Sequence, residues 1–286
     1  MKILALTDLS PLSKVGVIYA ANLCVALNSK LIVMNVLNID KLTQIRSGFN
    51  DNDEVIKMLT MKRENECLDF IEQVRDEVVG DFNPELFIEK SNSVFFEELV
   101  DTFSVNHKCN LIVMSTKGAS GIKKHILGSN AAAVIGNNNS IPVLTIPEYA
   151  SFKGLKNFVY ATDMKRLSEE FAVVLSLVKL LNSSITVLHI CQSNNLPKFN
   201  EAAMAKNLRD SFGYEKINCV YILNSEVKRG IEQYLNGRNA DIIAMFSSKP
   251  SFVGRLLKRS NSREMVSGSY VPILTFSNNE AVVVVR

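Results

Sequence analysis

The sequence has little of what would place it in several common classes of protein. Its five cysteines are scattered and odd in number, with no CxxC pair and no Cys/His spacing typical of a metal site. This argues against a disulfide scaffold and favours buried thiols in a reducing compartment. The three histidines lie far apart in the sequence, which argues against metal binding. The net charge is only +3, without a basic run, and so gives no support to nucleic-acid binding.

Long apolar runs and the common nucleotide motifs are missing too. No run approaches the length of a membrane span, and the N-terminal segment has no cleavage site, so we expect a cytoplasmic protein without a membrane partner. Neither GxxxxGK[ST] nor GxGxxG occurs, and no paired carboxylates or Ser/His/Asp set stands out. We therefore expect a binding protein rather than an enzyme, with slow hydrolysis at most.

What the chain does contain is a regular alternation of short apolar runs with longer segments of helical period. The apolar runs do not alternate with polar residues, which is typical of parallel strands buried on both faces. The expected strands are Lys2–Thr7, Leu31–Leu37, Glu85–Glu89, Leu111–Ser115, Pro142–Ile146, Asn157–Ala161, Ser184–Ile190, Asn218–Leu223, Ile242–Phe246 and Ile273–Phe276. The helical segments between them are Leu12–Leu27, Asn50–Val79, Val94–His107, Asn130–Gly136, Leu167–Leu181, Asn200–Phe212, Val227–Leu235 and Val253–Val266.

The second half of the chain repeats the pattern of the first. Asn110-Leu-Ile-Val-Met-Ser-Thr-Lys-Gly118 corresponds to Asp241-Ile-Ile-Ala-Met-Phe-Ser-Ser-Lys249. The matched single residues are Asp8 and Asp163, Ser129 and Ser260, and Pro142 and Pro272. We predict two tandem α/β domains, 1–148 and 149–286, joined by a linker within Glu148–Leu155. Each is expected to be an open five-stranded parallel sheet flanked by helices, in two separate sheets packed on each other.

Residues suited to an anion lie where the first half's sheet should end. Asp8 follows the first strand, Ser115 ends the fourth, and Gly128 and Ser129 precede a helix. A helix N-terminus offers free N–H groups to phosphate, and glycine permits close backbone approach. Alternatively, Asp8 caps the following helix or bonds loop amides, and Gly128 is only a turn with Ser129 as the helix cap.

These residues resemble the nucleotide-binding branch of the universal stress protein family, whose motif after strand four is G-x2-G-x9-G-[S/T]. Here Gly118, Gly128 and Ser129 match at the family spacing, and Ser115 replaces the first glycine. The resemblance covers the whole chain as two tandem copies. It implies Rossmann-like domains of the adenine nucleotide alpha hydrolase-like type.

The resemblance also implies roles for single residues around a bound ATP, with or without Mg²⁺. Asp8 would bond the ribose, and the backbone of Val36 would meet the adenine edge. Met114 and Ser115 would border the nucleoside. The phosphates would be held by Gly118, Gly128, Ser129 and Asn130.

The second copy has lost the three motif positions. Phe246, Lys249 and Arg259 stand there, so their side chains should fill the cradle and we expect no nucleotide in it. The sequence thus favours a tandem universal stress protein, an ATP-binding regulatory module with the nucleotide in its first half. The alternatives are a nucleotide-independent scaffold protein and a slow ATP hydrolase.

The resemblance further implies pairing through the fifth strands, Val143–Ile146 and Ile273–Phe276, either within the chain as a pseudo-dimer or in a homodimer. An unpaired apolar strand edge invites such pairing. The C-terminal segment Ala281–Arg286 has four consecutive valines and is expected to form a β tail.

Overall fold

The computed structural model describes residues 1–39, 52–91, 95–116, 127–137, 141–191, 200–246, 249–257 and 271–277. Within them, the first half holds strands β1 (Lys2–Thr7), β2 (Lys30–Asn38), β3 (Glu85–Ser91), β4 (Leu111–Ser115) and β5 (Val143–Ile146). Its helices are α1 (Pro11–Leu27), α3 (Asn52–Arg75), α4 (Phe96–Asn106) and α5 (Ser129–Gly136). The second half holds strands β6 (Asn157–Thr162), β7 (Ser184–Cys191), β8 (Ile217–Leu223), β9 (Ile242–Phe246) and β10 (Ile273–Phe276). Its helices are α6 (Leu167–Leu180), α7 (Glu201–Phe212), α8 (Val227–Leu235) and α9 (Pro250–Leu257).

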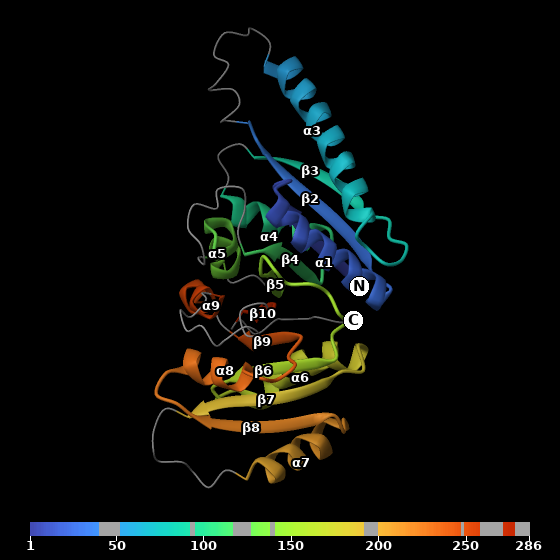
Figure 1. The fold of residues 1–286 in the computed structure, drawn as a ribbon. Coiled ribbons are helices and arrows are strands. Elements are labelled where there is room, and N and C mark those ends of the chain that lie inside the picture. The colour runs from blue at the N-terminus through green and yellow to red at the C-terminus, as the bar shows by residue number, and fades with distance from the viewer. Residues whose placement is uncertain are drawn as a thin grey trace.

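All ten strands form one sheet, in the order β3-β2-β1-β4-β5-β10-β9-β6-β7-β8 (Figure 1). Each half contributes five parallel strands, as predicted, and the two sets meet where β5 and β10 pair antiparallel. The expectation of two separate sheets is therefore wrong. The reason is that β5 and β10 are short apolar edges, and each satisfies the other's backbone groups.

The helices cover both faces of this sheet and bury two layers of apolar side chains. In β1, Ile3 and Ala5 belong to the layer under α1, α3, α6 and α7, while Leu4 and Leu6 belong to the layer under α4, α5, α8 and α9. Both faces of the central strands are buried, which explains why their sequences do not alternate. No helix in the described parts of the chain is long and apolar enough to cross a membrane.

The repeat extends to individual hydrogen bonds at the amino ends of the strands. The backbone N–H of Lys2 donates to Asn110 Oδ1 at 2.8 Å, and that of Asn157 donates to Asp241 Oδ2 at 2.8 Å. The two halves thus share a backbone frame in detail.

Within the β5–β10 pair, Thr145 Oγ1 also donates to the carbonyl of Ile273 at 3.1 Å. The halves touch outside this pair as well. A Cβ on Gly136 of α5 would lie 3.0 Å from Pro250 of α9. Between β5 and β6 the chain forms no helix or strand, and the Phe152 ring there meets Tyr19 of α1 edge-on, with ring centroids 5.2 Å apart. The tail 278–286 lies outside the described residues, so the predicted β tail stays a prediction.

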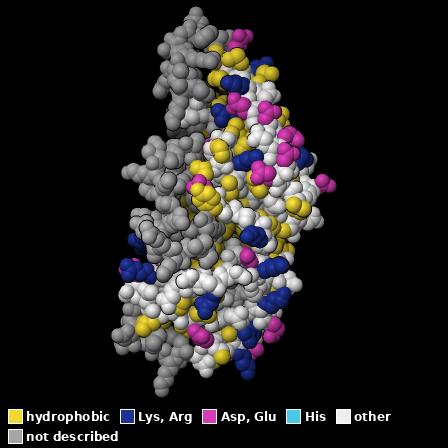
Figure 2. All heavy atoms as spheres, in the orientation of Figure 1, with side chains coloured by type: hydrophobic (Ala, Val, Ile, Leu, Met, Phe, Trp, Pro, Cys, Tyr) yellow, Lys and Arg dark blue, Asp and Glu magenta, His cyan; other side chains and the backbone are white. Residues whose placement is uncertain are grey.

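Charge is divided unequally between the halves. Residues 1–148 carry 18 Asp and Glu against 14 Lys and Arg, whereas residues 149–286 carry 11 against 18. Figure 2 shows the acidic side chains gathered over the α3 part of the molecule and more basic ones over the second half. The first half's overall charge therefore does not attract anions, so an anion there would depend on local donors.

Candidate functional site at the carboxyl ends of β1, β2 and β4

Strand order reverses beside β1 in the first half. The chain runs from β1 to β2 and β3 on one side, then crosses to β4 and β5 on the other. Ligands of open parallel sheets bind beyond the carboxyl ends of the strands at such a reversal. Most of the predicted site residues lie here, because Asp8 follows β1, Val36 is near the end of β2 and Ser115 ends β4.

A tight turn follows β1 and carries Asp8. The Leu9 N–H donates to Thr7 Oγ1 at 3.0 Å, and the Ser10 N–H donates to Asp8 Oδ1 at 3.1 Å. These bonds hold Leu9 at φ 62, a left-handed conformation that costs an L-residue about 1–2 kcal/mol. Ser10 caps α1, its hydroxyl accepting from Ser13 N–H at 3.1 Å. Asp8 itself is exposed, so its carboxylate bonds a loop amide, as the alternative interpretation holds, and also faces solvent.

The second half contains the same turn. Thr162 Oγ1 accepts from Met164 N–H and Asp163 Oδ1 from Lys165 N–H, both at 3.0 Å, and Met164 has φ 69. Local structure alone therefore accounts for an aspartate in both copies. Asp8 by itself does not distinguish a working site from a structural turn.

Ser115, at the position of the family's first glycine, makes a hydrogen bond within the protein. Its hydroxyl donates to the carbonyl of Leu12 in α1 at 2.6 Å. Gly16 makes this possible, because a Cβ there would lie 2.7 Å from Ser115 Oγ and 3.2 Å from its backbone nitrogen. The side chain is thus accommodated against α1.

The N-terminus of α5 reaches the end of β4. Gly128 N–H donates to the carbonyl of Thr116 at 2.7 Å, and α5 begins at Ser129. Gly128 occupies the cap position, so the interpretation of Ser129 as the cap is wrong. Its φ of −62 is open to any residue, so backbone strain does not require glycine here. Ser129 and Asn130 are exposed on the first turn, whose N–H groups lack helical partners.

The remaining predicted residues divide between the two faces of the sheet. The β1–β2 register ends at Thr7 and Asn35, so Val36 is the first residue of β2 beyond β1, and it is half-buried. Met114 is buried in the layer under α4 and α5, on the face opposite Ser115. Gly118 lies outside the described residues, and its predicted role stays a prediction.

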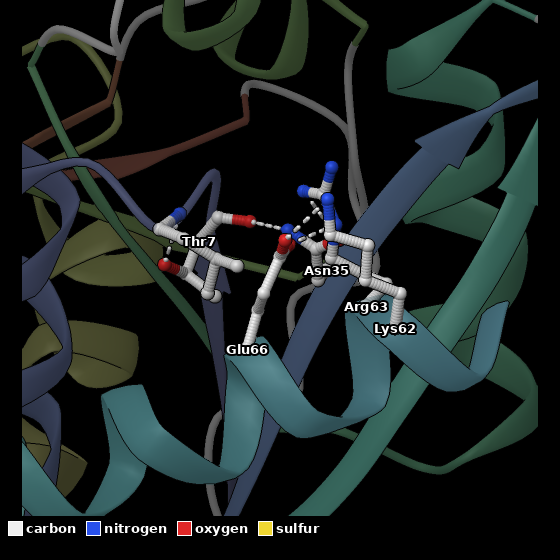
Figure 3. Close-up of polar contacts among 6 residues, drawn as sticks. Thr7, Asn35, Lys62, Arg63 and Glu66 are labelled. Atoms are coloured by element: carbon white, nitrogen blue, oxygen red, sulfur yellow. Dashed lines mark hydrogen bonds and ion pairs between the residues drawn. The ribbon is translucent and has the colours of Figure 1, made fainter. Parts of the chain in front are cut away.

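Sequence reasoning missed a polar cluster at the ends of β1 and β2, shown in Figure 3. Asn35 is 1% exposed, and its Nδ2 donates to the Thr7 carbonyl at 2.8 Å. Arg63 of α3 approaches Asn35 Oδ1 at 3.5 Å and pairs with Glu66 at 3.1 Å, while Lys62 lies 3.8 Å from Glu66. The available signal was Asn35 itself, a polar residue inside the apolar run of β2.

In the second half, four aromatic rings pack together at positions that correspond to Ser115 and its neighbours in the first half. By strand register, Ala5, Ser115 and Ile146 of the first half correspond to Tyr160, Phe246 and Phe276 of the second. Gly16 corresponds to Phe171, because the two lie at the same spacing after the matched Asp8 and Asp163. Phe246 stacks on Phe276 with centroids 4.9 Å apart and meets Tyr160 edge-on at 6.4 Å. Phe171 lies 6.0 Å from Tyr160.

The Tyr160 hydroxyl donates to Glu170 Oε2 at 2.6 Å beside this cluster. Burial, with the Glu170 bond second, raises the pKa of Tyr160, and burial likewise raises the pKa of Glu170. Both groups are thus more easily kept neutral than in water. Tyr160, Phe171 and Phe276 are fully buried in the core of the second half, and Phe246 packs against them at the end of β9.

None of the five cysteines has the lowered thiol pKa that nucleophilic chemistry requires. All five are buried and free of disulfides. Burial raises the pKa of the Cys24 thiol to about 12 and that of Cys67 to about 11. Such thiols stay protonated at neutral pH.

Comparison with known proteins agrees with the fold. A sequence model of the universal stress protein family matches residues 1–147. Among solved structures, a universal stress protein from Archaeoglobus fulgidus DSM 4304 is similar over 97% of this chain and 98% of its own, with a TM-score of 0.67 and 18% identity.

Two structures from Pseudomonas aeruginosa are more distant. A functionally unknown protein from strain PAO1 covers 98% of this chain and 94% of its own, with a TM-score of 0.55 and 13% identity. A putative universal stress protein from strain UCBPP-PA14 covers 96% and 92%, with a TM-score of 0.51 and 13% identity. At these identities the likeness concerns the fold. No curated protein matches the chain.

Proposed function

Because this chain belongs to the universal stress protein family, we propose that it is a nucleotide-binding regulatory module of the stress response that holds ATP in its first half. The observation that carries the proposal is a difference between the two halves at matched strand ends: β4 ends in Ser115, whereas β9 ends in Phe246. The Ser115 hydroxyl donates to the Leu12 carbonyl of α1, and Gly16 leaves the space for it. Phe246 instead presents a half-buried ring at the end of β9.

The polar groups at the first half's strand ends suit a nucleotide. Asp8 is exposed after β1, Val36 lies just beyond the β1–β2 register, and the first turn of α5 is tied to the end of β4 through Gly128. A carboxylate can accept from ribose hydroxyls, and helix N–H groups can donate to phosphate oxygens. Gly118, with Ser129 and Asn130, would complete the phosphate side. Mg²⁺ would neutralise phosphate charge there.

The experiment is to denature the purified protein and identify any released nucleotide by mass spectrometry. Calorimetric titration with ATP follows, on protein freed of nucleotide. We expect an adenine nucleotide at about one per chain, since Phe246 and the other side chains at the motif positions should fill the second half's cradle. Two per chain would show that the aromatic cluster does not exclude ligand, and none by either method would remove the proposal.

A nucleotide-independent scaffold is the second candidate, favoured by a specific surface. Met58, Met61 and Leu68 of α3 are each more than half exposed, and large exposed apolar side chains on one helix are typical of contact surfaces. A slow ATP hydrolase is the third. Phosphate release with Mg²⁺ would separate it from a binding module.

We place the module in the cytoplasm. Its buried thiols suit a reducing compartment. Fractionation of cells that express the protein tests this.

A further inference from the structure

We propose that Asn35 is a positioning residue for the first half's ligand site, fixing the Thr7 carbonyl and with it the turn that carries Asp8. The inference rests on the proposed function, because it concerns the same site. It adds a residue that lies beneath the site rather than on it.

The Asn35 amide is buried and makes a specific hydrogen bond. Its side chain is 1% exposed within a strand whose other buried residues are apolar, and a buried amide is costly unless it is hydrogen-bonded. Nδ2 donates to the carbonyl of Thr7 at 2.8 Å. Thr7 is the last residue of β1, and its hydroxyl in turn accepts from Leu9 N–H. Asn35 therefore holds the point from which the Asp8 turn departs.

The second half holds the matching carbonyl with a different side chain. Register pairs Thr7 with Asn35 and Thr162 with His189. His189 Nδ1 lies 2.9 Å from the Thr162 carbonyl. Since a carbonyl only accepts, Nδ1 carries the proton in this bond. Both copies thus place a donor at this position, which makes the bond a feature of the turn.

In the first half, the Asn35 side chain also reaches α3. Asn35 Oδ1 faces Arg63 Nη1 at 3.5 Å, and Arg63 is oriented by Glu66 at 3.1 Å (Figure 3). An imidazole that donates through Nδ1 has no equivalent oxygen. The amide therefore serves both the turn and the helix.

The part of α3 that carries Arg63 is an extension. Both α3 and α7 end near an arginine that donates to a carbonyl at or shortly before the next strand. Arg75 donates to Phe82 at 3.3 Å and Arg209 to Ile217 at 2.9 Å. Aligned on these arginines, α7 (Glu201–Phe212) matches only the last part of α3 (Asn52–Arg75). Arg63 precedes that part. The first half, which we propose binds the ligand, is thus the half whose turn is linked to a longer helix.

The test compares two matched substitutions. Asn35→Leu removes the donor beneath the Asp8 turn, and His189→Leu removes the equivalent donor beneath the Asp163 turn. Asn35→His restores a donor of the kind used in the second half. Arg63→Met leaves the bond to Thr7 in place and removes only the link to α3. ATP affinity is measured by calorimetry and the melting temperature by scanning calorimetry, in the full chain.

We expect Asn35→Leu to weaken ATP binding about tenfold or more, equivalent to about 1.4 kcal/mol, the size of one hydrogen bond. Asn35→His should recover most of that affinity, and Arg63→Met should fall between Asn35→Leu and the natural protein. His189→Leu should lower the melting temperature as Asn35→Leu does, with ATP affinity unchanged. Because Arg63 is partly exposed, its variant remains informative even if Asn35→Leu does not fold.

Two results would overturn the inference alone, with the proposed function intact. One is undiminished ATP affinity in Asn35→Leu or, if that variant does not fold, in Arg63→Met. The other is an equal loss of affinity in His189→Leu, which would make the effect one of general stability. If the natural protein bound no ATP, the proposed function would fail and the inference with it.

Discussion

The two halves share one backbone frame but fill its strand ends in opposite ways. Each has the same turn after its first strand, stabilised by a threonine hydroxyl and an aspartate. At four matched positions the first half has Ala5, Gly16, Ser115 and Ile146, where the second half has four aromatic rings. The comparison teaches that one strand order and one turn geometry can carry either mostly smaller side chains or packed aromatic rings at the same positions.

The largest expected effect comes from removing one ring of the second half's aromatic cluster. Phe171 is fully buried within the aromatic cluster, and Phe171→Ala should reduce the free energy of unfolding by about 3–5 kcal/mol through lost burial and the cavity left behind. Urea denaturation measures this. Phe95→Ala, at a ring that is 68% exposed, is the control and should stay within about 0.5 kcal/mol. A small loss in Phe171→Ala would mean that the cluster is not the core of this half.

The second prediction places a long side chain at the N-terminus of α5 in the first half. Gly128→Arg copies Arg259 of the second half and should weaken ATP binding at least about 100-fold, or about 2.7 kcal/mol, since a long side chain would occupy the α5 N-terminus. The backbone at φ −62 accepts arginine, so stability should hold. Calorimetry reads the affinity.

Arg259→Gly is the matched control for that change. It should create no second site, because Phe246 still occupies the end of β9. Unchanged affinity in Gly128→Arg would contradict the assigned phosphate loop, and a stoichiometry of two in Arg259→Gly would contradict the role given to the aromatic cluster.

A third, smaller effect concerns the close approach of α1 to β4. A Cβ at Gly16 would meet Ser115 Oγ at 2.7 Å, so Gly16→Ala should cost about 1–3 kcal/mol by overpacking, despite the better helix propensity of alanine. In a Ser115→Ala background the same change should cost less, and a double-mutant cycle measures the difference. Additive losses would show that the two residues do not compete for space.

The smallest effect concerns the Tyr160–Glu170 bond, which Ala5 cannot form in the first half. Burial raises the pKa of Glu170 above its ordinary 4.5, so its ionised form costs stability at neutral pH, and that cost disappears as the pH falls through the raised pKa to below 4.5. Glu170→Gln should therefore melt slightly higher than the natural protein at pH 7. Melting curves at pH 7 and pH 4 should show this gain shrinking with acidity, and a gain that grows would reverse the sign argued here.

Much of the fold could be predicted from local sequence. The apolar runs Lys2–Thr7, Leu111–Ser115 and Ile242–Phe246 are strands with the predicted bounds, because a parallel strand buried on both faces leaves a continuous apolar run. Helix ends were less accurate. The helix expected to run to Val79 ends at Arg75.

What failed depends on contacts between distant residues. The pairing of β5 with β10, about 130 residues apart, is confirmed as the family resemblance implied. Its consequence, one continuous sheet, was not predicted, because no local pattern reports whether two edges meet within one sheet. The aromatic cluster joins rings from four elements, of which only Phe246 lay on a motif position. Asn35 and Arg63 meet across 28 residues, and only the amide in an apolar strand pointed to them.

The β5–β10 junction makes assembly independent of dilution. Two separate chains that meet through an edge come apart as their concentration falls, whereas two edges on one chain face a fixed effective concentration. That junction also uses both edges, leaving β3 and β8 as the outermost strands. On β3 the exposed Glu85 and Lys90 are the kind of charged residues that discourage a further strand. Half of this chain can thus act as a permanent partner for the other.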